Sequence, residues 1–199
     1  MSGPRPASPG RVAGLVAVLA LLAVALFVGT RSRAAEPVAA DPRLAAARAA
    51  AALPACPPGL TTDLPDLRLP CFGGWPDVAV SRPPGRPTVV NLWATWCPPC
   101  VDEVPELVAF AAAAGDRVGV VGVAHQDSPL SVYTFAQQFR IGYPLLRDDE
   151  GDVLRKYGSF LPVTLLVAGD GALRHVQVGA YPTVAALQDA VAVHLGVRV

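Results

Sequence analysis

Residues 88–107 read TVVNLWATWCPPCVDEVPEL, and this stretch joins two local patterns that together decide the fold. Its beginning, Thr88–Trp93, is a near-continuous apolar run, which is typical of a strand buried on both faces of a sheet. From Pro98 onward the apolar residues recur at helical spacing, so we expect a helix that ends before Gly115. A second apolar run, over 118–124, completes a β-α-β unit.

The sequence beyond this unit predicts further strands and helices. In chain order we expect a helix over 129–140, a strand near Leu145, a helical turn over 153–157, a hairpin of 163–167 and 172–178, and a helix over 183–195. We therefore predict an α/β domain in which helices cover both faces of a mixed central sheet.

An uncharged run over 12–30 precedes this domain and consists mainly of Leu, Val, Ala and Phe. At about 1.5 Å per residue it would span roughly 28 Å, close to the hydrocarbon core of a bilayer. The residues before it carry Arg5 and Arg11 and no acid, as in a secretory signal or a signal-anchor. We expect 1–34 to be a single-pass transmembrane signal-anchor in the cell membrane, with the rest of the chain extracytoplasmic; a buried core helix is the alternative.

The chain after the anchor divides by composition. Ser32 and Ala34 form a weak cleavage pattern, so a cleaved, secreted form is an alternative to the anchored one. Residues 35–59 are rich in Ala and Pro, and we expect a tether there with a short helix. The domain is expected over 60–199, and its first part, 60–87, is dense in turn formers, which predicts an irregular cap with a hairpin.

The charge balance bears on possible partners. The whole chain carries 16 basic and 16 acidic side chains, and 16% of its residues are charged. Without residues 1–34 it has 12 basic and 16 acidic side chains, because that segment holds four arginines and no acid. The exported part is mildly acidic and has no basic stripe, so we do not expect nucleic acid as a partner.

Cys97 and Cys100 lie two residues apart where the predicted strand leads into the predicted helix. Thiols at this spacing can close a small disulfide ring and open it with little backbone movement. We expect Cys97 to be the N-cap, where the positive end of the helix dipole stabilises a thiolate. Because Pro98 and Pro99 lack amide hydrogens, only the amides of Cys100 and Val101 are expected to reach its sulfur. A static disulfide and half of a zinc site are the alternatives.

The run VVNLWATWCPPCVDEVPEL, the apolar leader and the segment Leu161-Pro162-Val163-Thr164 carry a resemblance. They are similar to the membrane-anchored thioredoxin-like thiol-disulfide oxidoreductases of the TlpA/ResA type, a group that includes the thioredoxins of cytochrome c maturation. The resemblance covers roughly 60–199. It implies a thioredoxin-like fold that exchanges disulfides with proteins outside the cytoplasm and needs no cofactor beyond its own cysteines.

The resemblance assigns roles to single residues. Cys97 would attack a partner, and Cys100 would resolve the mixed disulfide. Pro105 matches a helix-kinking proline, and Pro162 matches a cis-proline whose preceding residue, Leu161, pairs through its backbone with an extended substrate. The expected substrate-binding residues are Trp96, Pro98, Pro99, Leu161 and Pro162.

One position departs from thioredoxin itself, which has a buried Asp six residues before the first cysteine, where this chain has Asn91. The ResA-type proteins instead have a Glu three residues after the second cysteine, which here is Glu103. One helical turn from Cys100, Glu103 could accept its proton as a third catalytic residue. The alternative is that Asp102, Glu103 and Glu106 complement the helix dipole near its start.

The other two cysteines, Cys56 and Cys71, bracket the cap, and we expect a structural disulfide between them. A second redox relay is the alternative. A zinc site is not expected, because zinc would need a second close pair of cysteines. Trp93 and Trp75 are expected to be packing residues, while Trp96 shields the thiols.

Three histidines and two other functions complete the expectations. His125 ends a strand on the side of the sheet where α/β sites lie, but we expect a solvated loop residue; His175 and His194 are expected at the surface.

A thiol peroxidase would need Thr three residues before the reactive cysteine, where this chain has Ala94. A copper metallochaperone would use both thiols and His125, with the cysteines spaced further apart.

The expected function is extracytoplasmic disulfide exchange, in the reductive direction. The partners would be exported proteins with disulfides or thiols, such as apocytochrome c, and a membrane redox donor or acceptor. The reduction potential decides the direction, because such pairs range from about −270 mV for reductants to about −120 mV for strong oxidants. Oxidation of new exported proteins is the alternative direction, and the sequence leaves the direction, the specific substrates and redox partner, cleavage of the leader and the oligomeric state open.

Overall fold

The computed structural model describes residues 41–74 and 76–199. The predicted signal-anchor over 1–34 and the packing prediction for Trp75 lie outside these residues. Among the helices in this described part, we find none whose length and hydropathy would let it span a bilayer.

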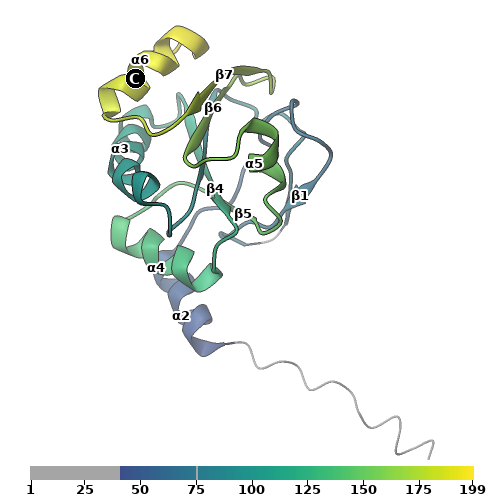
Figure 1. Ribbon diagram of the computed structural model, residues 1–199, viewed down its shortest axis with the longest axis vertical. Coiled ribbons are helices and arrows are strands. Elements are labelled where there is room, and N and C mark those ends of the chain that lie inside the picture. The colour runs from purple at the N-terminus through teal and green to yellow at the C-terminus, as the bar shows by residue number, and fades with distance from the viewer. Residues whose placement is uncertain (1–40, 75) are drawn as a thin grey trace, which may run out of the picture. The chain divides into compact units, whose positions relative to one another are not determined.

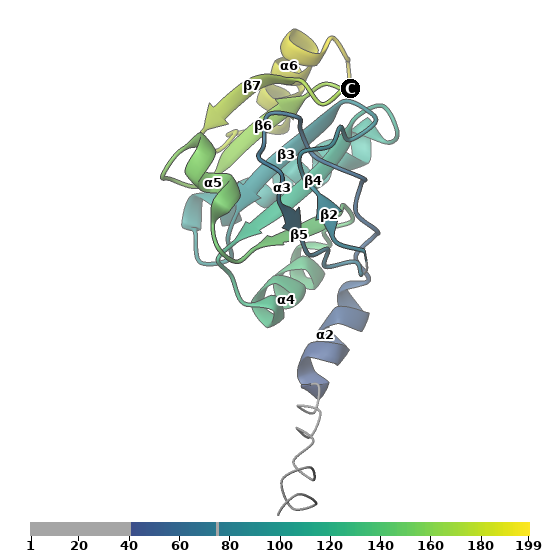
Figure 2. The same cartoon turned by 90° about the vertical axis from the view of Figure 1, so that its right-hand side faces the viewer.

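A mixed five-stranded sheet forms the centre of the domain (Figures 1 and 2). Its strands are β3 (Thr88–Trp93), β4 (Gly119–His125), β5 (Leu145–Asp148), β6 (Val163–Val167) and β7 (Leu173–Val178). They are ordered β5-β4-β3-β6-β7, with β3, β4 and β5 parallel and β6 antiparallel to both β3 and β7. The predicted β-α-β unit and C-terminal hairpin are therefore present.

Helices lie on both faces of this sheet, as predicted (Figure 1). They are α2 (Pro42–Ala51), α3 (Pro98–Ala114), α4 (Pro129–Phe139), α5 (Asp152–Tyr157) and α6 (Val184–Leu195). In β3, Val89 and Trp93 pack in one apolar core with α3, α4 and α6, whereas Val90 and Leu92 pack in a second core with α5 and the cap. This alternation follows from the pleat of the strand, and it puts Asn91 on the face that α3 covers.

The cap contains the predicted hairpin, formed by β1 (Arg68–Leu69) and β2 (Val78–Ala79). The chain after β1 runs along the outer edge of β5, where the Phe72 amide donates to the Leu145 carbonyl and the Arg147 amide donates to the Pro70 carbonyl, both at 2.9 Å. A disulfide joins Cys71 in this segment to Cys56, with a Cα–Cα distance of 6.0 Å. It therefore fastens the cap at the edge of the sheet.

Replacing both Cys56 and Cys71 with serine is expected to lower the free energy of unfolding by about 3 kcal/mol, because the disulfide restricts the unfolded chain. Urea denaturation of the oxidised protein measures this. Cys71→Ser alone should cost about as much as the double replacement. An unchanged unfolding midpoint would contradict a structural role, and loss of exchange activity in a folded double variant would favour the redox relay.

The structure corrects the predicted tether over 35–59. Helix α2 packs Leu44, Ala47 and Ala51 against the first core, and the Asp41 side chain accepts a hydrogen bond from the Arg43 amide at its start. Residues from Asp41 onward therefore belong to the folded unit. The alanine stripe is a weak apolar signal in the sequence, because each methyl group buries little area.

Candidate active site

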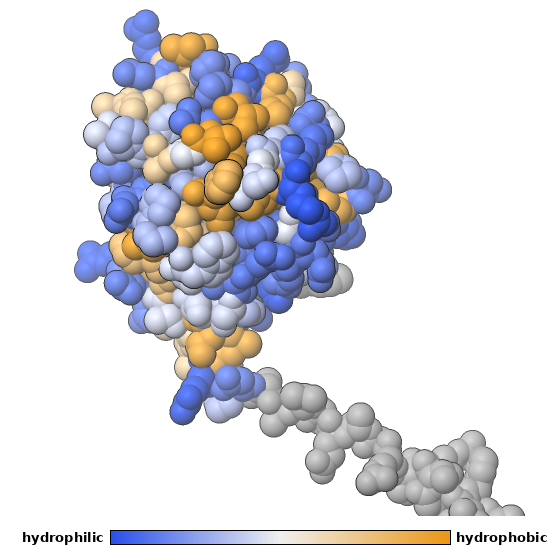
Figure 3. Space-filling view, viewed as in Figure 1, coloured by the Kyte–Doolittle hydropathy of each residue, from blue (hydrophilic) through white to orange (hydrophobic). Residues whose placement is uncertain are grey.

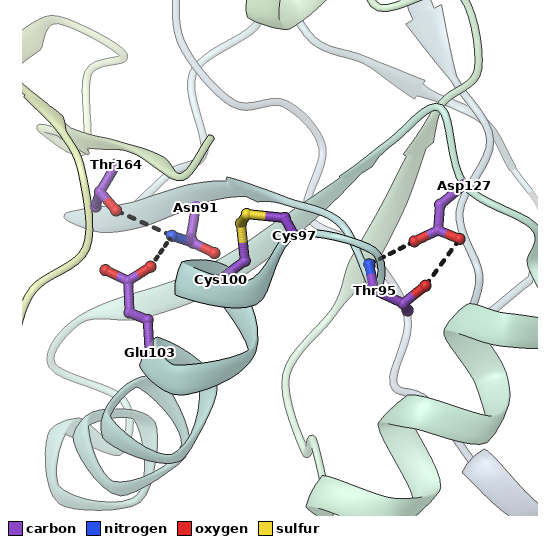
Figure 4. Close-up of a disulfide and its surroundings, with 7 residues drawn as sticks. All are labelled: Asn91, Thr95, Cys97, Cys100, Glu103, Asp127 and Thr164. Atoms are coloured by element: carbon purple, nitrogen blue, oxygen red, sulfur yellow. Dashed lines mark hydrogen bonds between the residues drawn. A yellow bond between two sulfur atoms is a disulfide. The ribbon is translucent and has the colours of Figure 1, made fainter. Parts of the chain in front are cut away.

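The CxxC pair occupies the junction between β3 and α3, where Cys97 is the N-cap and Pro98 is the first helical residue. The two cysteines form a disulfide with a Cα–Cα distance of 5.3 Å (Figure 4). Both are nearly covered: Cys97 is 4% exposed and Cys100 is 1% exposed. The slightly greater exposure of Cys97 agrees with the order of attack that the resemblance implies.

The hydrogen bonds at this helix start differ from the expected ones. The amides of Cys100 and Val101 donate to the carbonyl oxygen of Cys97, at 3.0 and 3.1 Å, and its sulfur accepts no capping hydrogen bond. The reason is that both of these amides are taken by the carbonyl, while Pro98 and Pro99 have no N–H to donate. Once the disulfide is reduced, the helix dipole would favour a thiolate at Cys97.

The loop before Cys97 is tied to the end of β4. The Asp127 carboxylate accepts from the Thr95 amide at 2.6 Å and from the Thr95 hydroxyl at 3.1 Å (Figure 4). The Trp96 indole donates to the Gln126 carbonyl at 3.3 Å, while 59% of this residue stays exposed. Thr95 and Asp127 were not predicted from the sequence. The available signal was an acid just after β4, the strand that is parallel to β3.

The Leu161–Pro162 peptide bond is cis. The antiparallel register sets Val163 opposite Leu92, so Pro162 lies at the end of β3 from which the chain leads to Cys97. Pro162 is buried and Leu161 is half-buried, whereas Pro98 and Pro99 are exposed.

An apolar surface accompanies these residues. Phe160, next to Leu161, is 76% exposed, and Val178, at the end of β7, is 53% exposed. Figure 3 shows hydrophobic surface gathered over β6 and β7 on this face. Such a surface suits contact with an apolar polypeptide segment.

Glu103 lies one turn after Cys100 on α3 and is only 1% exposed. Its Oε2 atom accepts from the Asn91 side-chain amide at 3.0 Å, and its Oε1 atom accepts from the Tyr181 backbone amide at 2.7 Å. Burial raises the pKa of Glu103 to about 7, and the hydrogen bonds from Tyr181 and Asn91 offset only part of that effect. A carboxyl with this pKa can bind and release a proton near neutral pH.

The alternative role for Glu103, complementing the helix dipole, does not fit this placement. The first turn of α3 contains no acid, and the effect of the dipole fades beyond that turn. Asp102 is exposed, and Glu106 accepts from the Val184 amide at 2.6 Å.

A third polar side chain, Thr164 on β6, joins this group. The Asn91 Nδ2 atom that donates to Glu103 also donates to the Thr164 hydroxyl at 3.0 Å (Figure 4). Asn91 and Thr164 are directly opposite each other on β3 and β6, and both are buried. The sequence analysis missed Thr164 and Tyr181, because strand pairing and a distant loop bring them to Glu103.

One of the three histidines differs from its prediction. His125 is the last residue of β4, is 9% exposed, and has Nδ1 at 3.7 Å from Asp148 Oδ2, so the solvated-loop prediction was wrong. In the parallel register of β4 and β5, His125 lies beside Asp148. His175 and His194 are half-buried and stack with ring centroids 4.0 Å apart.

Metal binding was an alternative for the two cysteines and for His125. Within residues 41–74 and 76–199, no three or more His, Cys, Asp or Glu side chains are grouped closely enough to hold a metal ion. His125 therefore does not join Cys97 and Cys100 in such a group in this disulfide form.

The sheet order, the CxxC disulfide at the start of α3 and the neighbouring cis-proline define a thioredoxin-like protein. The sequence matches the Redoxin family over residues 62–193, and the chain belongs to this family. The predicted kinship with thioredoxin-like proteins of the TlpA/ResA type is confirmed by its relatives.

Two of these relatives are named thiol-disulfide oxidoreductase ResA. The protein from Geobacillus thermodenitrificans is 32% identical over 99 residues, covering 48% of this chain and 56% of the relative. The protein from Bacillus subtilis is 30% identical over 97 residues, covering 48% and 54%. The chain thus spans about half the length of the curated relatives it matches.

Solved structures agree on the fold. A secreted Mycobacterium tuberculosis disulfide oxidoreductase, described as homologous to E. coli DsbE, has 25% identity and a TM-score of 0.57, covering 64% of this chain and 96% of that one. StoA from Bacillus subtilis has 23% identity and a TM-score of 0.53, covering 62% and 93%. The second likeness supports the fold alone.

Proposed function

We propose that this chain is a thiol-disulfide oxidoreductase that reduces disulfides in exported proteins. The observation that carries the proposal is the Cys97–Cys100 disulfide, closed at the start of α3 with Cys97 as its N-cap. A pair at such a site can be opened and closed repeatedly, because the helix dipole favours the thiolate that attacks and leaves.

The proposed reaction starts from the reduced pair. The Cys97 thiolate attacks one sulfur of a partner disulfide, which forms a mixed disulfide and releases the other partner sulfur as a thiolate that takes up a proton. The Cys100 thiol then loses its proton, and its thiolate attacks the Cys97 sulfur. This releases the second partner sulfur as a thiolate and leaves the disulfide seen here, so two electrons pass to the partner, whose two thiolates take up protons from the solvent.

Glu103 is proposed to take the proton from Cys100. The pKa of about 7 that burial gives to Glu103 suits this transfer. Trp96, Pro98, Pro99 and the Leu161 backbone are proposed to contact the partner, because they lie on or beside the exposed surface at this end of β3.

The proposed cellular setting is based on the sequence. Residues 1–34 are proposed to anchor the chain in the cell membrane, with the domain on the extracytoplasmic side. There the pair would reduce cysteines of exported proteins, including apocytochrome c before haem attachment. A membrane redox donor would then return Cys97 and Cys100 to the reduced form.

The test is the reduction potential of the Cys97–Cys100 pair, measured on the full chain in detergent by equilibration with thiol redox buffers. A value near about −270 mV supports the reductive direction, and a value near about −120 mV contradicts it. Cys56→Ser/Cys71→Ser serves as the matched control, because it leaves one disulfide to titrate.

A further inference from the structure

The two hydrogen-bond partners of the Glu103 carboxyl are both donors, which suits its ionised form. Oε2 accepts from Asn91 Nδ2 at 3.0 Å and Oε1 accepts from the Tyr181 amide at 2.7 Å, so both oxygens face donors. An ionised carboxylate only accepts, whereas a protonated carboxyl must also donate its O–H. A protonated Glu103 would have to turn its O–H toward an acceptor, and neither of these two donors offers one in the arrangement seen.

The two partners differ in their freedom to change. The Tyr181 partner is a backbone N–H and cannot become an acceptor, so Oε1 has to remain an acceptor. We therefore place the proton on Oε2, the oxygen whose partner, Asn91, can change from donor to acceptor. The Asn91 side chain carries a donor and an acceptor on the same amide group, and a rotation of about 180° about its last side-chain bond exchanges them.

Thr164 completes the exchange. Its hydroxyl accepts from Asn91 Nδ2 at 3.0 Å, and a hydroxyl can turn to donate instead. After the Asn91 amide rotates, Oδ1 can accept from the Oε2 hydroxyl of Glu103 and from the Thr164 hydroxyl. We propose that Asn91 and Thr164 are positioning residues that reverse their hydrogen bonds each time Glu103 gains or loses a proton.

Among the other groups around Glu103, the buried Tyr181 hydroxyl has no hydrogen-bond partner, and the Asn91 contacts measured below distinguish its use from a turn of the Asn91 amide. The pKa of Tyr181 is raised to about 12, mainly by burial and further by Glu103, so its phenol stays neutral while Glu103 titrates. The pKa of the buried Tyr143 is raised for the same two reasons. On α3 itself, Glu106 already accepts from the Val184 amide, and Asp102 is exposed.

The inference rests on the proposed function, in which the proton on Oε2 comes from the Cys100 thiol. In thioredoxin the position of Asn91 holds an acid. Here the Asn91 amide does not titrate but would keep Glu103 hydrogen-bonded in both states, so the carboxyl could cycle without losing its own hydrogen bonds.

The experiment uses a property of the sequence: Asn91 is the chain's one asparagine. Labelling the oxidised full chain in detergent with nitrogen-15 asparagine therefore gives one side-chain amide in the NMR spectrum. Carbon-13 labelling of the glutamate carboxyls follows Glu103, whose signal is identified by its loss in Glu103→Gln. Nuclear Overhauser contacts from the Asn91 Nδ2 protons to Thr164 then report the orientation of the amide on both sides of the Glu103 midpoint.

The expected result is that the contacts to Thr164 are strong about one pH unit above the midpoint and lost about one pH unit below it. In Glu103→Gln, whose side chain stays neutral, they should not change with pH. Contacts that persist on both sides, or a Glu103 that does not titrate between about pH 5 and pH 9, would overturn the inference. Neither outcome touches the exchange activity, which is tested separately through Cys97.

A matched pair of variants gives a functional readout. Thr164→Val keeps the shape but removes the hydroxyl, which leaves one Asn91 N–H unpaired when Glu103 is ionised; the pKa of Glu103 should rise by about one pH unit. Thr164→Ser restores the hydroxyl and should keep the wild-type midpoint. A merely structural role for Thr164 would alter stability in both variants without moving the midpoint.

Discussion

Replacing Cys97 with serine is expected to lower thiol-disulfide exchange roughly a thousandfold or more, to the background rate, because a neutral hydroxyl is a poor nucleophile. The fold should be retained, since Cys97 contributes only a small side chain to the first core. The measurement is turnover of a disulfide-containing protein such as insulin by the reduced enzyme, with Cys56 and Cys71 left intact.

Cys100→Ser is the matched control for this result. That variant keeps the attacking sulfur and lacks the resolving one, so it should stop at a mixed disulfide that reducing agent releases. Exchange that continues in Cys97→Ser, or a Cys100→Ser variant that never yields a covalent complex with any partner, would contradict the proposed function.

The wild type is expected to lose about 3 kcal/mol of stability between low pH and a pH above neutral through Glu103. Replacing Glu103 with glutamine is expected to remove this loss. The pKa of Glu103 is raised from 4.5 to about 7, so the folded state holds this proton more tightly than the unfolded state does. The contribution of Glu103 to the stability of the wild type is therefore greatest below about pH 4.5, falls as the pH rises to about 7, and is then constant. Glutamine has no such dependence.

Urea unfolding of both proteins across this pH range measures the effect as the difference between their free energies of unfolding. Asn91 can accommodate the glutamine by turning its amide, so Glu103→Gln should fold. Glu106→Gln removes the neighbouring carboxylate of the same helix and should leave the dependence set by Glu103 in place. If the difference in the free energy of unfolding between the wild type and Glu103→Gln stays constant with pH, Glu103 does not titrate in this range.

The strand and helix around the cysteines could be predicted because their signals are local. The apolar run of Thr88–Trp93 specifies a buried strand, and Pro98 after Cys97 specifies a helix start. Both elements appear with these bounds, as expected where the local preferences are strong.

The surroundings of Glu103 could not be predicted, because they depend on pairing between distant segments. Thr164 meets Asn91 only through the register of β6 against β3, and the Tyr181 amide arrives from the loop after β7. His125 was misjudged for a similar reason, since a neighbouring strand that covers a residue leaves no mark beside it in the sequence.

The order of the two disulfides along the chain has a consequence for biogenesis. Cys56 pairs with Cys71 and Cys97 pairs with Cys100, so each cysteine bonds to its nearest neighbour and neither loop encloses the other. A polypeptide oxidised progressively from its N-terminal end during translocation would reach this connectivity directly. That order of oxidation would need no isomerase to reshuffle mispaired bonds.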